Sequence, residues 1–309
     1  MTPSWLWAVF TVIAAFAQTL RNAMQRELTG SLGTVGATHV RFLFGLPFVL
    51  VFFAGVLLAT GTEVPRPGPV FWPWVIDGAF AQVAATALML AAMGERSFVV
   101  TIAYIKTEPV QVAIFGLLFL GDAVTWPMMT AIVIATVGVV IMSTKSFSAL
   151  VGKRDDNRPS IAGGIRPTLL GLAAGGMFAL SAIGFRGAIL SLGLPNYVAA
   201  ATFTLAVGIA MQAVALSLYL ALRDRPVLTA IMRAWKPSLF AGLMGAVASQ
   251  FWFLAFALAT AASVRTLALV EVLFAQIIAR VAFGQRTSAR EAVGMGLVIC
   301  GVALLIWAY

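Results

Sequence analysis

Long apolar stretches separated by short polar segments run along almost the whole chain. Ten of them are long enough to cross a bilayer as a helix, which takes about 20 residues. They are residues 5–27, 34–59, 70–93, 97–120, 124–144, 167–192, 195–221, 237–259, 262–283 and 288–308. Strand-like alternation is absent, so the backbone is expected to form its hydrogen bonds within helices. The pattern predicts an all-α integral membrane protein with ten transmembrane helices.

One long polar stretch, residues 145–166, divides the ten spans into two sets of five. The predicted domains are therefore a first five-helix repeat at 1–146, a polar linker at 147–166 and a second five-helix repeat at 167–309. Because five is an odd number, the second set enters the membrane from the opposite side. The expected architecture is a pair of inverted repeats, a common transporter design with the substrate site between the repeats.

A constant shift of 163 residues supports this duplication, because it aligns landmarks of the two halves without gaps. Under that shift Glu108 falls on Glu271, Gly138 falls on Gly301, and the first span falls on the sixth. Each half therefore carries one acid in the middle of an apolar span.

Composition agrees with a membrane protein. Hydrophobic residues make up 61% of the 309 residues and charged residues 10%, and the mean hydropathy is +1.00; a soluble protein has roughly 45–50% apolar and about 25% charged residues. The formal net charge of +9 comes from basic residues in links and span ends, which indicates orientation in the membrane and no nucleic-acid partner. The single cysteine, Cys300, can form no internal disulfide.

The links between spans 1 and 2, 3 and 4, 5 and 6, 7 and 8, and 9 and 10 hold most of the basic residues, while Arg66 is nearly alone on the other face. The positive-inside rule then places these links in the cytoplasm and both termini outside. Seven tryptophans near span ends are expected to lie in the interfacial belts: Trp5, Trp7, Trp72, Trp74, Trp126, Trp235 and Trp307.

The two acids are the first candidates for function, because a carboxylate at bilayer depth is costly unless it is protonated, paired or facing water. Tyr104, Glu108 and Gln111 are spaced i, i+4 and i+7, which predicts one polar stripe on the fourth span. Pro109 removes a backbone donor and predicts a kink beside the acid. The ninth span has Leu267 and Phe274 at the corresponding positions, so we expect the first half to hold more of the chemistry.

Lys106 lies about 200° around the helix from Glu108, so its expected partner is an acid on another helix, with Glu271 first. Two interpretations stay open. Lys106 and the two glutamates form a buried charge cluster that fixes helix packing, or one desolvated carboxylate binds and releases a coupling proton.

Other polar residues within the spans are weaker candidates. In the first span Gln18 and Asn22 are expected to reach deepest, while Arg21 and Arg26 can extend to the interface. His39 and Arg41 start the second span and could bind an anionic group or lie at the interface. The remaining candidates are Gln82, Arg186, Gln212, Gln250 and Trp252. Trp252 either stacks on a substrate or packs in the core.

Missing motifs narrow the function. The chain has no Walker A loop, no paired-aspartate motif, no HExxH and only one histidine. ATP hydrolysis and enzymatic activity are therefore not expected, and neither a cofactor nor a metal ion is. Secondary transport is the function that this pattern favours.

Several residues resemble the EamA-like ten-helix permeases of the drug/metabolite transporter superfamily. They are Arg41, Glu108-Pro109-Val110, Leu120-Gly121-Asp122 and Gly138, then Glu271, Phe283-Gly284-Gln285 and Gly301. The chain departs from the family pattern at Asp122 and Gln285, where glutamate is usual, and at Val272, which is not proline. The resemblance implies that spans 5 and 10 are peripheral and that spans 1, 3, 4, 6, 8 and 9 line a central cavity. It also implies cytoplasmic termini, against the charge count.

The sequence thus predicts a multi-pass secondary transporter of the bacterial inner membrane that exports a small amphipathic metabolite, such as an amino acid, by alternating access. Its partners are the bilayer, a small-molecule substrate and a coupling proton, and it is a monomer or homodimer. The expected substrate or proton-binding residues are Glu108, Tyr104, Lys106, Gln111, Glu271, Gln18, Asn22, Gln82, Arg41, Gln250 and Trp252. A broad multidrug exporter of the same fold is the alternative, and a membrane enzyme or scaffold is a remote third.

Overall fold

The computed structural model describes residues 3–95, 104–152, 165–274, 276–277 and 288–308, and this part of the chain contains no strand. The helices are α1 (Leu6–Leu43), α2 (Leu46–Thr60), α3 (Phe71–Glu95), α5 (Glu108–Phe115), α6 (Trp126–Gly152), α7 (Ile165–Ser191), α8 (Tyr197–Arg223), α9 (Arg225–Arg233), α10 (Trp235–Leu258), α11 (Ala261–Leu267) and α13 (Ala289–Trp307); a π-helical turn η1 (Gly116–Leu120) follows α5, and a 3₁₀ turn η2 (Ala268–Val270) follows α11. The all-α class is confirmed.

Six helical segments of the described residues are long and apolar enough to cross a membrane. Two shorter apolar segments, Glu108–Leu120 and Trp126–Met142, accompany them. The chain is therefore a multi-pass membrane protein. The predicted spans 97–120 and 262–283 both include residues outside the described part, so the number of ten spans stays a prediction.

The first two predicted spans are joined by a sharp turn at Gly33, whose φ of 67° lies in the left-handed region. Glycine adopts this conformation without steric cost. The chain folds back at this turn, and a hydrogen bond of 2.9 Å from Gln25 Nε2 to Ala37 O joins the two sides of it. The second predicted span is also interrupted, at Phe44 and Gly45, before α2 starts with a proline in its first turn.

Two helices differ from the predicted pattern. Helix α6 continues to Gly152, past its expected end at residue 144. Helix α9 forms within the segment that was expected to be only a basic link between the seventh and eighth spans. Asp224 caps α9, a proline follows in its first turn, and Ile231 is fully buried on one face. This arrangement is typical of a short amphipathic helix at a membrane surface.

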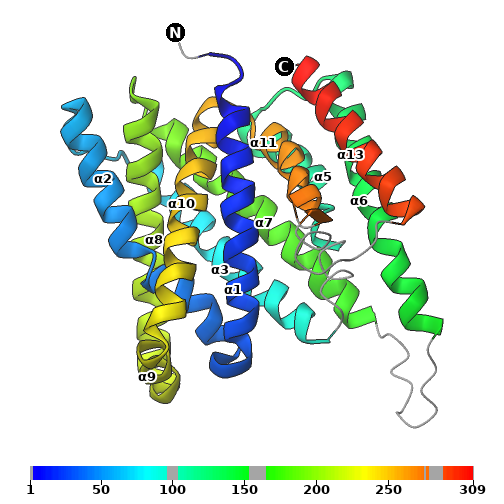
Figure 1. The fold of residues 1–309 in the computed structure, drawn as a ribbon. Helices are drawn as coiled ribbons and strands as arrows, with labels where there is room; N and C mark the ends of the chain where they lie inside the picture. The colour runs from blue at the N-terminus through cyan, green and yellow to red at the C-terminus, as the bar shows by residue number, and fades with distance from the viewer. Residues whose placement is uncertain (1–2, 96–103, 153–164, 275, 278–287, 309) are drawn as a thin grey trace.

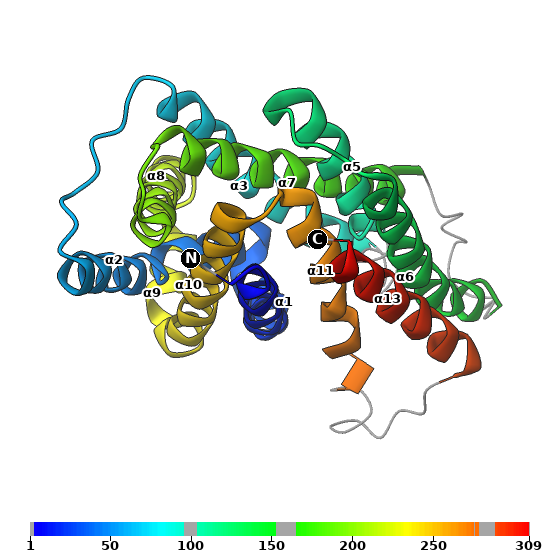
Figure 2. The same ribbon diagram turned by 90° about the horizontal axis from the view of Figure 1, so that it is seen from above.

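The helices pack in pairs that join the two halves of the chain (Figures 1 and 2). Helix α1 lies along α10, α3 along α7, α2 along α8, and α6 along α13. The α6–α13 pair forms one edge of the bundle, as expected for spans 5 and 10. Both termini lie at one end of the bundle, and α9 lies at the other end (Figure 1).

Glycines permit the closest of these helix contacts. A Cβ on Gly184 of α7 would lie 2.6 Å from the backbone nitrogen of Gly78 on α3, and a Cβ on Gly138 of α6 would lie 2.7 Å from the carbonyl oxygen of Gly294 on α13. Small residues at such positions let transmembrane helices approach with their backbones.

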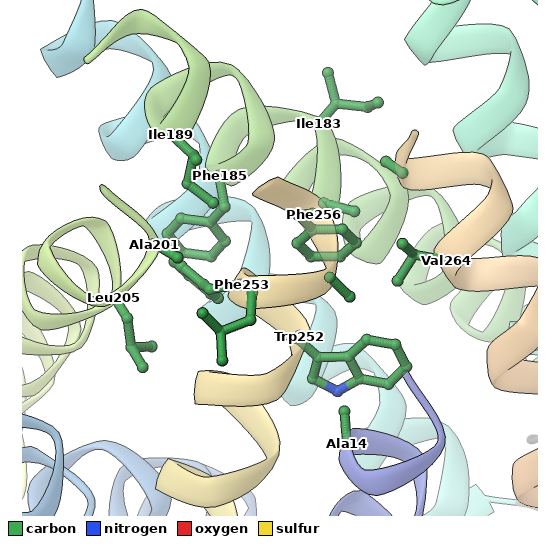
Figure 3. Packing of buried hydrophobic residues seen from close by; sticks show 14 of the residues in the cluster. Ala14, Ile183, Phe185, Ile189, Ala201, Leu205, Trp252, Phe253, Phe256 and Val264 are labelled. Carbon is green, nitrogen blue, oxygen red and sulfur yellow. The ribbon is translucent and has the colours of Figure 1, made fainter. Parts of the chain in front are cut away.

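The main buried cluster contains side chains from helices of both halves, including Ala14 from the first half and Phe185, Trp252 and Val264 from the second (Figure 3). Trp7 belongs to it and is 3% exposed, so its ring packs against other helices, and its expected place at the membrane interface stays a prediction. Its ring packs inside the bundle, although Trp7 lies only four residues after the first described residue. The core therefore continues across the contact between the two halves.

Candidate functional site

Two buried ion pairs connect the halves of the chain at the centre of the bundle. Lys106 Nζ lies 2.7 Å from Glu271 Oε2, and Arg265 Nε lies 3.1 Å from Glu108 Oε1. In each pair, the base comes from one half and the acid from the other. The expected pairing of Lys106 with Glu271 is confirmed.

Local backbone breaks place these four side chains. The helix of the fourth span is interrupted at Lys106 and Thr107, and α5 restarts at Glu108 with Pro109 in its first turn. The Pro109 ring would clash with the carbonyl four residues earlier, which explains the break. On the other half, Thr260 caps α11 directly after α10 ends, so that Arg265 enters the interior within the first two turns.

The two pairs differ in quality. Lys106 donates a hydrogen bond to Glu271 Oε2, and Gln18 Nε2 donates to the same oxygen at 3.2 Å. The Arg265 and Glu108 atoms lie at ion-pair distance, but neither atom has an aligned hydrogen bond among the described residues. Glu108 is therefore the less firmly held of the two acids. Both acids rely on residues from the opposite half, and the expectation that the first half holds more of the chemistry stays a prediction.

Gln18 and Trp252 connect the two pairs. The indole Nε1 of Trp252 donates to Gln18 Oε1 at 3.1 Å, and the Arg265 guanidinium carbon lies 4.7 Å from the centroid of the Trp252 ring. A cation over an aromatic face is attracted by the ring quadrupole. Contacts thus run from Lys106 through Glu271, Gln18, Trp252 and Arg265 to Glu108.

A central cavity lies beside this network. Its lining residues come from six predicted spans, the first, second, third, sixth, eighth and ninth: Gln18, Arg41, Gln82, Phe178, Phe185, Ser249, Trp252, Phe253, Phe256 and Arg265. A water-sized sphere can place its centre in only about 10 Å³ of this cavity, which is room for roughly one water molecule. This conformation is therefore closed around the site, and any larger solute needs a wider state.

The aromatic side chains of the cavity wall are packed against one another. The rings of Phe185 and Phe253 have centroids 4.6 Å apart, and those of Trp252 and Phe256 are stacked at 6.2 Å. Figure 3 shows Trp252 between Ala14 of α1 and Val264 of α11. Trp252 is part of the core and also lines the cavity, so both of its expected roles are compatible with its position.

Two further arginines are buried close to the cavity. Arg21 is 2% exposed and Arg41 is 3% exposed. The interfacial position expected for Arg21 is wrong, because its guanidinium lies in the interior and contacts Asn22 Oδ1 at 2.8 Å. Arg41, which was expected at an interface or an anion site, lines the central cavity.

The remaining candidates are divided between the cavity and helix contacts. Tyr104 packs on Gly171 of α7, and Gln111 lies against Gly175 and Gly176 of the same helix. The helix is interrupted at Lys106 and Thr107, but Tyr104 and Gln111 both pack against α7, so the single stripe of Tyr104, Glu108 and Gln111 stays a prediction.

Gln82 lines the cavity, where its Oε1 accepts from Gln212 Nε2 at 3.0 Å. Gln250 instead donates to Thr202 Oγ1 on α8 at 2.7 Å. Of the two, only Gln82 is therefore positioned to contact a solute in the cavity.

Arg265 was not among the expected site residues. Its signal is visible, because it is a lone base near the start of the apolar ninth span. The spacing to Glu271 is six residues, which gives no pairing on one helical face, and its partner Glu108 is far away in the chain.

Arg186 forms a second polar cluster near the end of the bundle that holds the termini. It donates to the carbonyl oxygens of Phe256 and Ala259 at 2.7 and 2.6 Å, and its Nη2 lies 3.1 Å from Asp122 Oδ1. These contacts connect α7 with the C-terminal end of α10 and with the turn after η1. They tie the ends of these three elements together.

A larger hollow of about 280 Å³ lies between α3, η1 and α7, lined by residues that include Trp74, Asp77 and Phe119. It does not contain any member of the two ion pairs. We place the candidate site at the central cavity, because charged, polar and aromatic groups from both halves converge there.

The comparisons with known proteins agree with this picture. Residues 5–144 match the EamA-like transporter family, so the resemblance expected from the sequence is confirmed over that part of the chain. A solved structure titled "Crystal structure of protein" has a TM-score of 0.68 and 16% sequence identity, over 96% of this chain and 95% of its own. At that identity the likeness concerns the fold alone. No curated protein matches the chain.

Proposed function

From the match of residues 5–144 to a transporter family, we propose that this protein is a secondary active transporter that exports a small amphipathic metabolite by alternating access. The observation that carries the proposal is the pair of ion pairs, Lys106–Glu271 and Glu108–Arg265, which join the two halves beside a cavity. Charges at membrane depth that face a cavity between repeats are typical of substrate pathways.

Inverted repeats are part of the proposal. The packing of the helices supports them, because the contact of α1 with α10 corresponds under the 163-residue shift to the contact of α7 with α3. The pairs α2–α8 and α6–α13 each correspond to themselves. A two-fold relation between the halves produces this pattern, and it allows one half to rock against the other around the site.

The closed cavity fits one stage of such a cycle. The Arg186 cluster closes the end at which α10 terminates, and the aromatic wall fills the centre. In the proposed cycle, this end opens when the Arg186 contacts break, while the opposite end closes. A solute then reaches the cavity from one side of the membrane at a time.

Glu108 is the proposed proton carrier. Its Oε1 has an arginine at ion-pair distance without an aligned hydrogen bond, whereas Glu271 accepts from both Lys106 and Gln18. Protonation of Glu108 would release Arg265 and would loosen one of the two connections between the halves. Substrate binding and proton binding could in this way compete for the same arginine.

Transport in proteoliposomes tests the proposal. Vesicles loaded with a mixture of the twenty amino acids receive an imposed pH gradient, and release is measured by mass spectrometry for the parent, Glu108→Gln and Glu63→Gln. Glu63 is exposed in the loop after α2 and is the matched control. We expect gradient-driven release by the parent and the control, and no response to the gradient in Glu108→Gln. Equal, gradient-independent release by all three would contradict the proton role.

A further inference from the structure

We propose that the central cavity takes an organic anion with an aromatic body, whose anionic group binds Arg41 and Arg265. This inference rests on the proposed function and names the chemical class of its substrate. It starts from the balance of charge at the centre of the bundle.

Buried cations outnumber buried acids among the described residues. Arg21, Arg41, Lys106 and Arg265 are each at most 8% exposed, and the acids buried to that degree are Glu108 and Glu271. With all six groups ionised, the interior carries an excess of two positive charges. Burying an unpaired charge in a membrane is unfavourable, so this excess indicates a missing anionic partner.

The excess is located on Arg21 and Arg41. Lys106 is hydrogen-bonded to Glu271, whereas Arg265 lies at ion-pair distance from Glu108 without an aligned hydrogen bond and so keeps an unused donor. Arg21 Nε and Nη1 and Arg41 Nε are buried without any hydrogen-bond acceptor among the described residues, and the contact from Arg41 Nη2 to Ser249 Oγ is long, at 3.5 Å. A guanidinium has five donors and no acceptor, and the group that best satisfies its unused donors is a carboxylate or a similar oxyanion.

The arginines are placed so that one anion can reach more than one of them. A Cβ on Gly245 of α10 would lie 3.3 Å from both Arg21 Cδ and Arg41 Cγ, so both side chains pack over the same glycine. Arg41 and Arg265 line the same cavity. The cations therefore act on one small volume.

The rest of the cavity wall selects the body of the substrate. Five aromatic residues line it, namely Phe178, Phe185, Trp252, Phe253 and Phe256. The Arg265 guanidinium lies over the Trp252 and Phe256 rings, at 4.7 and 5.4 Å from their centroids. An anion bound to Arg265 would thus have its apolar part against these rings. A cationic drug would instead meet an excess of positive charge at the same place.

Three ligands with one body and different heads test the inference on purified protein: 3-phenylpropionate, 3-phenylpropylamine and 3-phenylpropanol. We expect 3-phenylpropionate to raise the melting temperature in detergent saturably, and the amine and the alcohol to have little effect. Preferential stabilisation by the amine or the alcohol, equal stabilisation by all three, or none by any, would overturn the inference.

Arginine variants locate the binding. Arg41→Gln should weaken 3-phenylpropionate binding roughly tenfold or more, since it removes charged hydrogen bonds, while Arg41→Lys should lie between it and the parent. Arg66→Gln, in the exposed loop before α3, is the matched control and should bind like the parent. Unchanged binding in Arg41→Gln would overturn the assignment to Arg41. If that variant does not fold, the comparison of Arg41→Lys with the parent decides the same question.

Movement of the same three compounds in proteoliposomes separates this inference from the proposed function. Binding of 3-phenylpropionate that depends on Arg41, without movement across the membrane, would leave the anion site standing and would overturn transport. Transport of the amine in preference to the acid would leave transport standing and would overturn the anion site.

Discussion

Lys106 and Glu271 are 165 residues apart in the chain, and their charged groups are 2.7 Å apart in the interior. The side chains of both are 10% exposed. This contact fixes the broken fourth span against the ninth span. The second ion pair joins the same two spans, but here the base, Arg265, is on the ninth span and the acid, Glu108, is on the fourth.

Breaking the first pair should be more costly than removing it. Lys106→Met and Glu271→Gln should each lower stability by roughly 3–5 kcal/mol, because each leaves a buried charge unpaired or a partner unsatisfied. The double variant should recover most of that loss. Thermal melting of the purified protein in detergent gives the four values of the cycle, with exposed Lys236→Met as a control. Losses that simply add would show that the two charges do not interact.

Removing the Arg186 contacts should loosen the end of the bundle that holds the termini. Arg186→Gln loses two bonds to carbonyl oxygens and the ion pair with Asp122, each worth about 1.5–3 kcal/mol for a charged donor. Asp122→Asn keeps the carbonyl bonds and should have the smaller effect. Hydrogen exchange of the α10 C-terminal turn measures the opening. Identical exchange in both variants and the parent would rule out a closing role for Arg186.

Glycine contacts should limit substitution at Gly184 of α7 but not at Gly296 of α13. Gly184→Ala places a methyl group 2.6 Å from the backbone of Gly78 and should cost about 1–3 kcal/mol through overpacking. Gly296→Ala, where a Cβ would meet nothing within 4 Å, should be neutral or slightly stabilising. Melting temperatures of the two variants provide the comparison. Similar values would mean that α3 and α7 do not approach as closely as described.

Replacing Trp252 should have a small effect on stability and a larger effect on ligand binding. Trp252→Phe keeps an aromatic wall and loses the hydrogen bond to Gln18 at 3.1 Å. We expect stability to fall by about 1 kcal/mol, and 3-phenylpropionate binding to weaken, because Arg265 loses its best aromatic face. Phe240→Leu on the exposed face of α10 serves as the control. Parent-like binding by Trp252→Phe would show that the indole has no part in the site.

Much of the architecture was readable from the sequence, because apolar length alone identifies membrane helices. The pairing of Lys106 with Glu271 was also readable, since a base and an acid within apolar spans need partners. The stripe of Tyr104, Glu108 and Gln111 stays a prediction, because the helix is interrupted at Lys106 and Thr107, between the first two of these residues.

The rest depended on tertiary contacts. Arg265 finds Glu108 across the bundle, and Arg21 is buried over Gly245 instead of extending to the interface. Nothing in the spacing of residues along one helix specifies either contact. The helix α9 had a readable signal, the cap Asp224 followed by Pro226, which the high basic charge of the segment obscured.

The most direct test of alternating access needs no substrate. Ser249 lines the central cavity and is 1% exposed, so a cysteine there, in a Cys300→Ser background, reports water access to the site. A membrane-impermeant maleimide is applied to right-side-out and to inside-out vesicles, with Leu218→Cys on the apolar surface of α8 as the unreactive control. We predict slow labelling of Ser249→Cys from both sides of the membrane. Labelling from one side only, or from neither, would contradict a cavity that opens alternately to the two sides.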